Sequence, residues 1–185
     1  MDDMGVALKG SWGASCWCMH PRLGDAETRE LPGNGPLKDR RRAAMTKLAC
    51  RRLAPGLLAY EDKQPVGWVA IGPRPEFERV DRSRATPRVD DVDVWIVPCV
   101  TVTKKARGQG IAVALIRAAV DYASRNGASA IEAYPRAGDE RTRDETIYSG
   151  TEPLFRHAGF KVIRSPLQDI PKNWLARVTM RIEVS

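Results

Sequence analysis

The segment from Val94 to Asn126 constrains the fold more strongly than any other part of the chain. Residues 94–102 are almost continuously apolar, as expected of a strand covered on both faces. A turn with glycine at positions 108 and 110 follows, and the apolar positions after it repeat with a helical period. One buried face of the predicted helix consists of Ile111, Leu115, Ala118, Ala119 and Tyr122. A strand, a glycine-rich turn and a helix in this order bring backbone N–H groups and the positive end of a helix dipole to one point, which can hold a phosphate.

The segments around this unit predict a mixed sheet. An apolar strand over 128–134 follows the helix, and a strand-helix-strand order with short connections favours parallel pairing by a right-handed crossover. Two apolar runs, 56–60 and 66–71, flank a polar turn and predict a β-hairpin. Pro98 lacks an N–H and predicts a bulge in the central strand. Further predicted elements are a helix over 38–53, a short helix from Thr151 to Ala158, and strands over 161–165 and 176–184.

Three further segments lack a clear helical period. Residues 11–20 alternate cysteine with tryptophan and methionine, which predicts a first strand, and residues 21–37 are rich in glycine and proline, which predicts a loop. We therefore expect an N-terminal strand and loop region over 1–37. Residues 74–91 mix arginines with acids and are longer than most loops in compact domains, so they are a candidate for shaping a substrate site.

Composition limits the class of protein. With 185 residues the chain is expected to form a single domain over 1–185. The formal net charge of +7 suits an anionic partner, but basic and acidic residues are interleaved, so a phosphorylated small molecule fits better than a polyanion. No apolar run approaches the ~20 residues that cross a bilayer, and the start lacks the pattern of a secretory signal. We therefore expect a cytoplasmic protein without membrane contact, with its four cysteines as free thiols.

Two motifs resemble the GCN5-related N-acetyltransferase (GNAT) superfamily. The run Arg-Gly-Gln-Gly-Ile-Ala from Arg107 to Ala112 matches the superfamily pattern R/Q-x-x-G-x-G/A, and it follows a predicted strand and opens a predicted helix. The run from Leu154 to Phe160 is similar to the superfamily's C-terminal helix followed by Gly-Phe. Three features together look like a bacterial branch of the superfamily whose acceptors are mostly unassigned: the Cys16-Trp17-Cys18 triplet, the strand Gly67-Trp68-Val69 with Gly72-Pro73-Arg74, and the turn Tyr148-Ser149-Gly150-Thr151. The resemblance, which covers about residues 56–184, implies an α/β (α+β) GNAT fold, a mixed central β-sheet with helices on both faces, and acetyl-CoA as co-substrate.

The resemblance also implies where the co-substrate binds. Glycines allow the backbone to approach a pyrophosphate without an intervening Cβ, main-chain amides donate to its oxygens, and Arg107 supplies charge. The last residues of the central strand would pair with the pantetheine arm like an additional strand, and their N–H groups are candidates for stabilising the oxyanion. The implied cofactor-binding residues are Val100, Thr101, Val102, Arg107, Gly108, Gln109, Gly110, Ile111 and Ala112. Candidate partners of the remaining phosphate are Lys104, Lys105 and Arg156.

Acetyl transfer to an amine requires a neutral amine, a polarised thioester carbonyl and a proton for the departing thiolate. Glu132, an acid within an apolar strand, is the first candidate for the base, because burial raises the pKa of a carboxyl group. The alternative is that Glu132 is a carboxylate paired with an arginine, and Asp93 is the second candidate for the base. The superfamily frequently uses a tyrosine as the acid at the position of Phe155, so Tyr134, Tyr148 or solvent must supply the proton here.

Cysteines and tryptophans offer further candidates. Cys99 lies beside the expected thioester position and raises an acyl-cysteine route, although direct transfer in a ternary complex fits the superfamily better. Cys16, Cys18 and His20 share one strand parity that would suit a metal, but no fourth ligand is evident, so we predict no metal site. The tryptophans at positions 12, 17, 68 and 95 are candidates for lining the acceptor site.

Together these observations predict an acetyl-CoA-dependent N-acetyltransferase that moves an acetyl group to a primary amine by direct attack in a ternary complex. The acceptor would be a small-molecule or peptide amine, and the protein a monomer or homodimer. Phe155 in the tyrosine position motivates an alternative, an acyl-CoA-binding module without turnover. Nucleic-acid binding through the arginines of 40–42 and 74–88 is a third hypothesis, and we predict no nucleic-acid partner.

Overall fold

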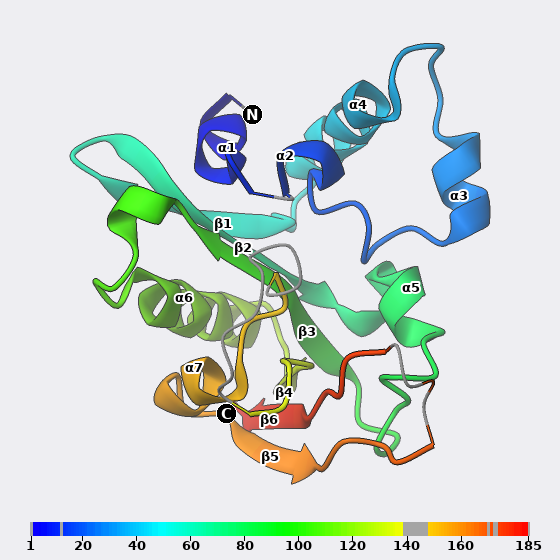
Figure 1. The fold of residues 1–185 in the computed structure, drawn as a ribbon, viewed down its shortest axis with the longest axis vertical. Helices are drawn as coiled ribbons and strands as arrows, with labels where there is room; N and C mark the ends of the chain where they lie inside the picture. The colour runs from blue at the N-terminus through cyan, green and yellow to red at the C-terminus, as the bar shows by residue number, and fades with distance from the viewer. Residues whose placement is uncertain (1, 12, 139–147, 170, 172–173, 185) are drawn as a thin grey trace.

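A computed structural model gives the fold and describes residues 2–11, 13–138, 148–169, 171 and 174–184 (Figure 1). Six strands form one sheet in the order β1-β2-β3-β4-β6-β5. β3 and β4 pair in parallel, and the other neighbouring strands pair antiparallel. The strands are β1 (Gly56–Glu61), β2 (Gln64–Pro73), β3 (Val94–Val102), β4 (Ala130–Ala133), β5 (Lys161–Arg164) and β6 (Thr179–Glu183). The predicted α+β class with a mixed sheet is confirmed.

Helices cover both faces of this sheet, as predicted (Figure 1). On one face, α6 (Ile111–Arg125) buries its apolar stripe against β2 and β3, and α7 (Glu152–His157) packs beside it. On the other face, α1 (Asp2–Leu8) and α4 (Leu37–Ala49) cover a second core with Trp68 and Cys99. The shorter helices are α2 (Gly13–Cys16), α3 (Asp25–Glu30), α5 (Glu78–Asp81), η1 (Arg74–Glu76) and η2 (Lys104–Ala106). Among the described helices, none is long and apolar enough to cross a bilayer.

The central strand, turn and helix form as the sequence predicts, and β3 and β4 diverge beyond their parallel register. That register runs from Val94 opposite Ala130 to Val97 opposite Ala133. On the other edge of β3, Cys99 pairs with Ala70 whereas Ile96 pairs with Gly72, so β3 carries one extra residue around Pro98. The predicted bulge is therefore confirmed. It lies where β3 leaves β4, and this separation opens the edge of β3 toward the segment that begins at residue 148.

The N-terminal region differs from the prediction. The strand expected over 11–20 is wrong, because α2 occupies 13–16 and Trp17 and Cys18 then adopt positive φ values of 50° and 51°. An extended strand cannot contain such residues, so the chain turns tightly and buries residues 16–19 together instead of alternately. The loop expected over 21–37 contains α3, and the segment over 74–91 contains η1 and α5.

Candidate active site

The turn before α6 has the geometry of an anion site. Gly108 and Gly110 have φ values of +80° and +78°, a left-handed conformation that glycine adopts without strain. A Cβ at either position would meet no protein atom within 4 Å, so the space over the turn is open. The helix begins with Ala114 N–H donating to Gly110 O, which leaves the amides of Ile111 and Ala112 without an intrahelical acceptor. This cradle of glycines and free amides fits a pyrophosphate.

A cavity of about 350 Å³, here called the cofactor cavity, follows the end of β3 toward this turn. It is lined by five of the nine predicted cofactor residues, Val100, Thr101, Val102, Arg107 and Ala112. Of the other four, Gly108, Gln109 and Gly110 form the turn itself and Ile111 begins α6, and none of these lines the cavity. The start of α7, with Gly150, Thr151 and Leu154, lines the cavity as well.

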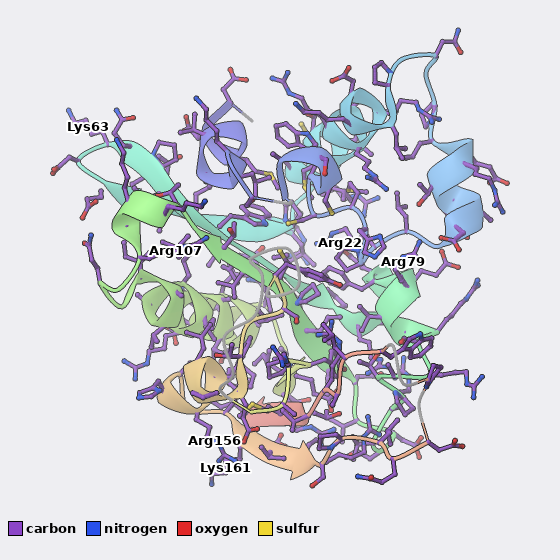
Figure 2. All side chains as sticks on the ribbon, in the orientation of Figure 1. Arg22, Lys63, Arg79, Arg107, Arg156 and Lys161 are labelled. Carbon is purple, nitrogen blue, oxygen red and sulfur yellow. The ribbon has the colours of Figure 1, made fainter. Side chains whose placement is uncertain are left out.

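Basic residues near the cofactor cavity differ in their engagement. Arg107, marked in Figure 2 near the start of α6, lines the cavity and donates from Nε to Val102 O at 3.2 Å. Lys104 and Lys105 are exposed on η2. Arg156 forms an ion pair with Glu152 on its own helix, with Nη2 and Oε1 2.6 Å apart. Of the predicted phosphate partners, Arg107 is therefore the cation on the wall of the cavity.

Val100 lines the cofactor cavity, and its backbone N–H is the group of β3 that bears on binding there. Thr103 N–H donates to Val66 O at 2.8 Å, so by strand alternation the N–H groups of Thr101 and Thr103 point to β2 and that of Val100 points away. Val100 N–H donates to the carbonyl of Tyr148 at 2.8 Å. The amide expected to meet the pantetheine arm is thus engaged by the segment that follows residue 147.

A second cavity of about 420 Å³, here called the acceptor cavity, adjoins the first. Pro21 and Tyr148 line both cavities, and the consecutive residues Pro98 and Cys99 line one each. The other residues lining it are His20, Arg79, Val80, Ser83, Ala85, Thr86, Tyr134, Ser149, Trp174, Leu175 and Arg177. The segment over 74–91 therefore contributes to the wall of this cavity.

Glu132 lies in a buried ionic network and lines neither of these cavities. Its Oε1 accepts from Arg181 Nε at 3.1 Å and from Nη2 at 2.6 Å. Its Oε2 accepts from the Tyr134 hydroxyl at 2.5 Å and lies 3.6 Å from Arg74 Nη1. The arrangement corresponds to the second interpretation of the sequence, a carboxylate paired with arginine. Asp93 is exposed at the start of β3, at the far end of the strand from the bulge.

Tyr134 borders the acceptor cavity, but its hydroxyl belongs to the same network. It donates to Glu132 and accepts from Arg74 Nη1. Burial first, and then the charge of Glu132, raise the pKa of Tyr134 well above its ordinary value, so the phenol holds its proton. Tyr148, in contrast, lies where the two cavities meet. Phe155 is fully buried in the core against Phe160, with ring centroids 5.2 Å apart.

The thiols near the junction of the cavities interact with each other. The Sγ atoms of Cys18 and Cys99 lie 3.4 Å apart, and Trp68 Nε1 donates to Cys18 Sγ at 3.1 Å. The hydrogen bond with Cys18, and burial after it, raise the pKa of the Cys99 thiol well above its ordinary value. Burial also raises the pKa of Cys16 to about 11. In the described part of the chain, His20, Cys16 and Cys18 do not form a group of three potential metal ligands.

The tryptophans lie elsewhere than expected. Trp17, Trp68 and Trp95 are buried in the two cores and line neither cavity, so the expectation that they line the acceptor site is wrong. Trp12 lies outside the described residues. Trp174, 42% exposed, lines the acceptor cavity instead. Large apolar residues in a small protein are most often needed for the core, and position along the sequence does not tell which one remains at a surface.

These features define an α+β protein whose parallel strands separate beside a glycine-containing turn with the geometry of an anion site, with two cavities meeting at the separation. The sequence profile of the acetyltransferase (GNAT) family matches residues 21–144, so the chain belongs to this family. It is accordingly an N-acetyltransferase that uses acetyl-CoA, as the motifs predicted.

Solved structures share the fold at low sequence identity. Ribosomal-protein-alanine N-acetyltransferase from Brucella melitensis is 20% identical with a TM-score of 0.54, over 81% of this chain and 80% of that one. An N-acetyltransferase from Staphylococcus aureus Mu50 is 17% identical with a TM-score of 0.56, over 98% and 93%. YncA from Salmonella typhimurium, solved with its cofactor acetyl-CoA, is 19% identical with a TM-score of 0.50, over 83% and 76%. A comparison with curated protein sequences returns no match.

Proposed function

We propose that the protein transfers the acetyl group of acetyl-CoA directly to the nitrogen of a primary amine within a ternary complex. The observation that carries this proposal is the junction of the two cavities at Tyr148 and at the Pro98–Cys99 step of β3. A thioester held along the end of β3 and an amine in the acceptor cavity would meet at this bulge. Holding both reactants in one complex removes much of the entropic barrier to their reaction.

The proposed reaction is balanced by two proton transfers. The amine nitrogen forms a bond with the acetyl carbon, the bond from that carbon to sulfur breaks, the amine loses a proton and the thiolate gains one. We assign the donor of that second proton to Tyr148, because it lines both cavities. Phe155 has no hydroxyl, and that of Tyr134 is held by Arg74 and Glu132.

The first proton transfer does not require a carboxylate in this proposal. Among the described residues that line the acceptor cavity there is no aspartate or glutamate. Asp93 precedes Cys99 by a stretch of β3 about 20 Å long, at about 3.3 Å per residue. We propose that the amine reacts in the fraction that is neutral in solution, which is substantial for the terminal α-amino group of a peptide, with a pKa of about 7.7–8.0, and smaller for a free amino acid, whose carboxylate favours the ammonium form.

The proposed binding of the pantetheine arm requires a local exchange of hydrogen bonds. Val100 N–H is held by the Tyr148 carbonyl, so an extended arm can pair with Val100 only after this carbonyl moves away. The exchange would couple binding of the co-substrate to the position of the proposed proton donor. A covalent acyl-enzyme on Cys99 is disfavoured, because the hydrogen bond with Cys18 and burial raise the pKa of its thiol.

The test of the proposed function is turnover with a panel of primary amines. Purified protein would be incubated with acetyl-CoA and each amine, with release of free CoA followed by a thiol reagent and the N-acetyl product identified by mass spectrometry. The proposal predicts equal amounts of CoA and N-acetyl product for at least one amine. Binding of acetyl-CoA without turnover on any amine would instead support the alternative of a binding module, which the buried Phe155 motivates.

A further inference from the structure

Basic side chains line the acceptor cavity, and no aspartate or glutamate is among its described lining residues. Arg79, Arg177 and His20 border it, together with hydroxyl and apolar side chains. A site that selects a polyamine or another cationic amine places carboxylates around the substrate, because opposite charges offset the cost of removing an ion from water. The charged side chains that line this cavity are positive instead.

Arg177 is the arginine best placed to bind an anion. It is half-buried just before β6, and its Nη1 donates to the Tyr134 carbonyl at 2.8 Å and to Ser149 Oγ at 2.5 Å. These two bonds fix the guanidinium plane but carry no negative charge. No carboxylate among the described residues lies within ion-pair distance of it. Nε and Nη2 therefore form an edge whose donors suit the two oxygens of one anionic group.

Arg79 contributes less net charge than Arg177. From α5, where Figure 2 marks it, its Nε donates to the carbonyls of His20 and Leu23, and its Nη2 pairs with Asp25 Oδ1 at 2.6 Å. Its role is to join α5 to the N-terminal segment, and Asp25 offsets its charge. His20 adds no charge beside Arg177, because burial first, and then Arg79 and Arg41, lower its pKa to about 4 and keep the imidazole neutral at pH 7.

We infer that the acceptor is a small primary amine that also carries an anionic group, a carboxylate or a phosphonate, bound by the free edge of Arg177. The inference rests on the proposed function and narrows its substrate class. Val80, Pro98, Trp174 and Leu175 line the same cavity and would contact an apolar part of the substrate. The volume of about 420 Å³ suits a molecule of amino-acid to dipeptide size.

Matched substrates test the charge requirement in the unaltered protein. Initial rates would be measured with leucine and phenylalanine, with their primary amides, with an aminoalkyl phosphonate, and with agmatine as a cationic amine. We expect the free acids to exceed their amides in kcat/KM by about tenfold or more. The comparison is stringent, because an amide lacks the negative charge that keeps the neighbouring ammonium protonated, and so its amine is the more available nucleophile. The phosphonate arm separates a carboxylate site from one that prefers a phosphorus acid.

Variants test whether Arg177 is the anion-binding residue. Arg177→Gln should lower kcat/KM for the anionic substrates about tenfold to a hundredfold, mainly through KM, and should lower kcat/KM for the amides by a clearly smaller factor, which reports the loss of the hydrogen bonds to Tyr134 and Ser149. Arg177→Lys should recover part of the loss, because it restores the charge without the planar fork. Arg84→Gln removes the same charge from an exposed neighbouring position outside the cavity and should change neither class. Thermal melting of each variant reports its folding.

Several results would overturn the inference. Amides or agmatine acetylated as well as the free acids by the unaltered protein would contradict it whatever the variants do. An equal loss for charged and neutral substrates in Arg177→Gln would show a structural role alone. If the protein acetylates neutral amines but no anionic ones, the inference is refuted and the proposed function is retained. If it acetylates no amine at all while acetyl-CoA still binds, both are refuted.

Discussion

Glu132→Gln removes one charge from the buried network and separates the two roles that the sequence allowed for this residue. The carboxylate is 1% exposed and accepts from Arg181 and Tyr134 at distances of 2.5 to 3.1 Å. Breaking a buried ion pair costs about 3–5 kcal/mol. Here Arg74 keeps Asp81 and Arg181 keeps Asp90, so the lower end applies and we expect a loss of about 3 kcal/mol. For a domain of this size that loss corresponds to about 6–12 °C in the melting temperature.

The assay is urea and thermal unfolding, with turnover measured at a temperature where the variant is folded. Glu183→Gln is the matched control, since Glu183 lies 3.8 Å from the same Arg181 but its side chain is 71% exposed. It should cost less than about 1 kcal/mol. Turnover of Glu132→Gln should stay within threefold of the unaltered protein. A stability loss no larger than that of the control would refute the structural role of Glu132. A fall in kcat of about a hundredfold in the folded variant would make Glu132 the base.

Three further predictions concern the proton donor, the turn and the acid sensitivity of the fold. Tyr148→Phe should lower kcat by about a hundredfold with KM for acetyl-CoA nearly unchanged, and an unchanged kcat excludes it as the acid. Gly110→Ala should raise KM for acetyl-CoA and cost about 1–2 kcal/mol of stability. Gly127→Ala, also at positive φ (86°) but at the other end of α6, should have the same cost in stability without the change in KM. Equal KM values for the two variants would argue against the turn as the phosphate site. His20 is neutral in both states above pH 6.5, but below it the unfolded chain takes a proton that the folded chain, with a pKa of about 4, refuses. The unfolding free energy should therefore fall by about 1–2 kcal/mol more between pH 6.5 and 4 than in His20→Gln, after discounting for partial exposure, and parallel pH profiles would contradict this.

The parts of the fold that followed from the sequence are those whose burial is set locally. The apolar run of β3 and the apolar stripe of α6 can be read locally, because their buried residues follow the pattern of a covered strand and of a helix. The proline at the bulge can be read locally as well, because it lacks an N–H. The conformation of the turn before α6 was predictable for the same reason. Gly108 and Gly110 have left-handed backbone conformations, which glycine adopts without strain and other residues do not.

The acceptor cavity could not be predicted in this way. His20, Ser83, Pro98, Trp174 and Arg177 meet there from segments far apart in the chain. No local period links an arginine before β6 to a histidine that follows α2. The N-terminal strand failed for a related reason, since residues 16–19 are all buried by tertiary contacts, and the alternation of residue types carried no information on their direction.

Glu132 shows how a correct observation left two interpretations. An acid inside an apolar strand does mark a buried carboxylate, as the structure has it. What the sequence could not supply was its partner, because Arg181 lies 49 residues further along the chain. A buried acid close to an active site is therefore a candidate catalyst only until the charges around it are known.

Direct transfer of an acetyl group from acetyl-CoA to an amine in the acceptor cavity is tested by mass spectrometry of both the small molecules and the intact protein, after incubation with acetyl-CoA and each amine of the panel. We expect N-acetyl product in an amount equal to the CoA released for at least one amine, with the protein unmodified, including when the amine is left out. Acetyl-CoA bound without product from any amine, or acetylated protein formed before the amine is added, would overturn direct transfer.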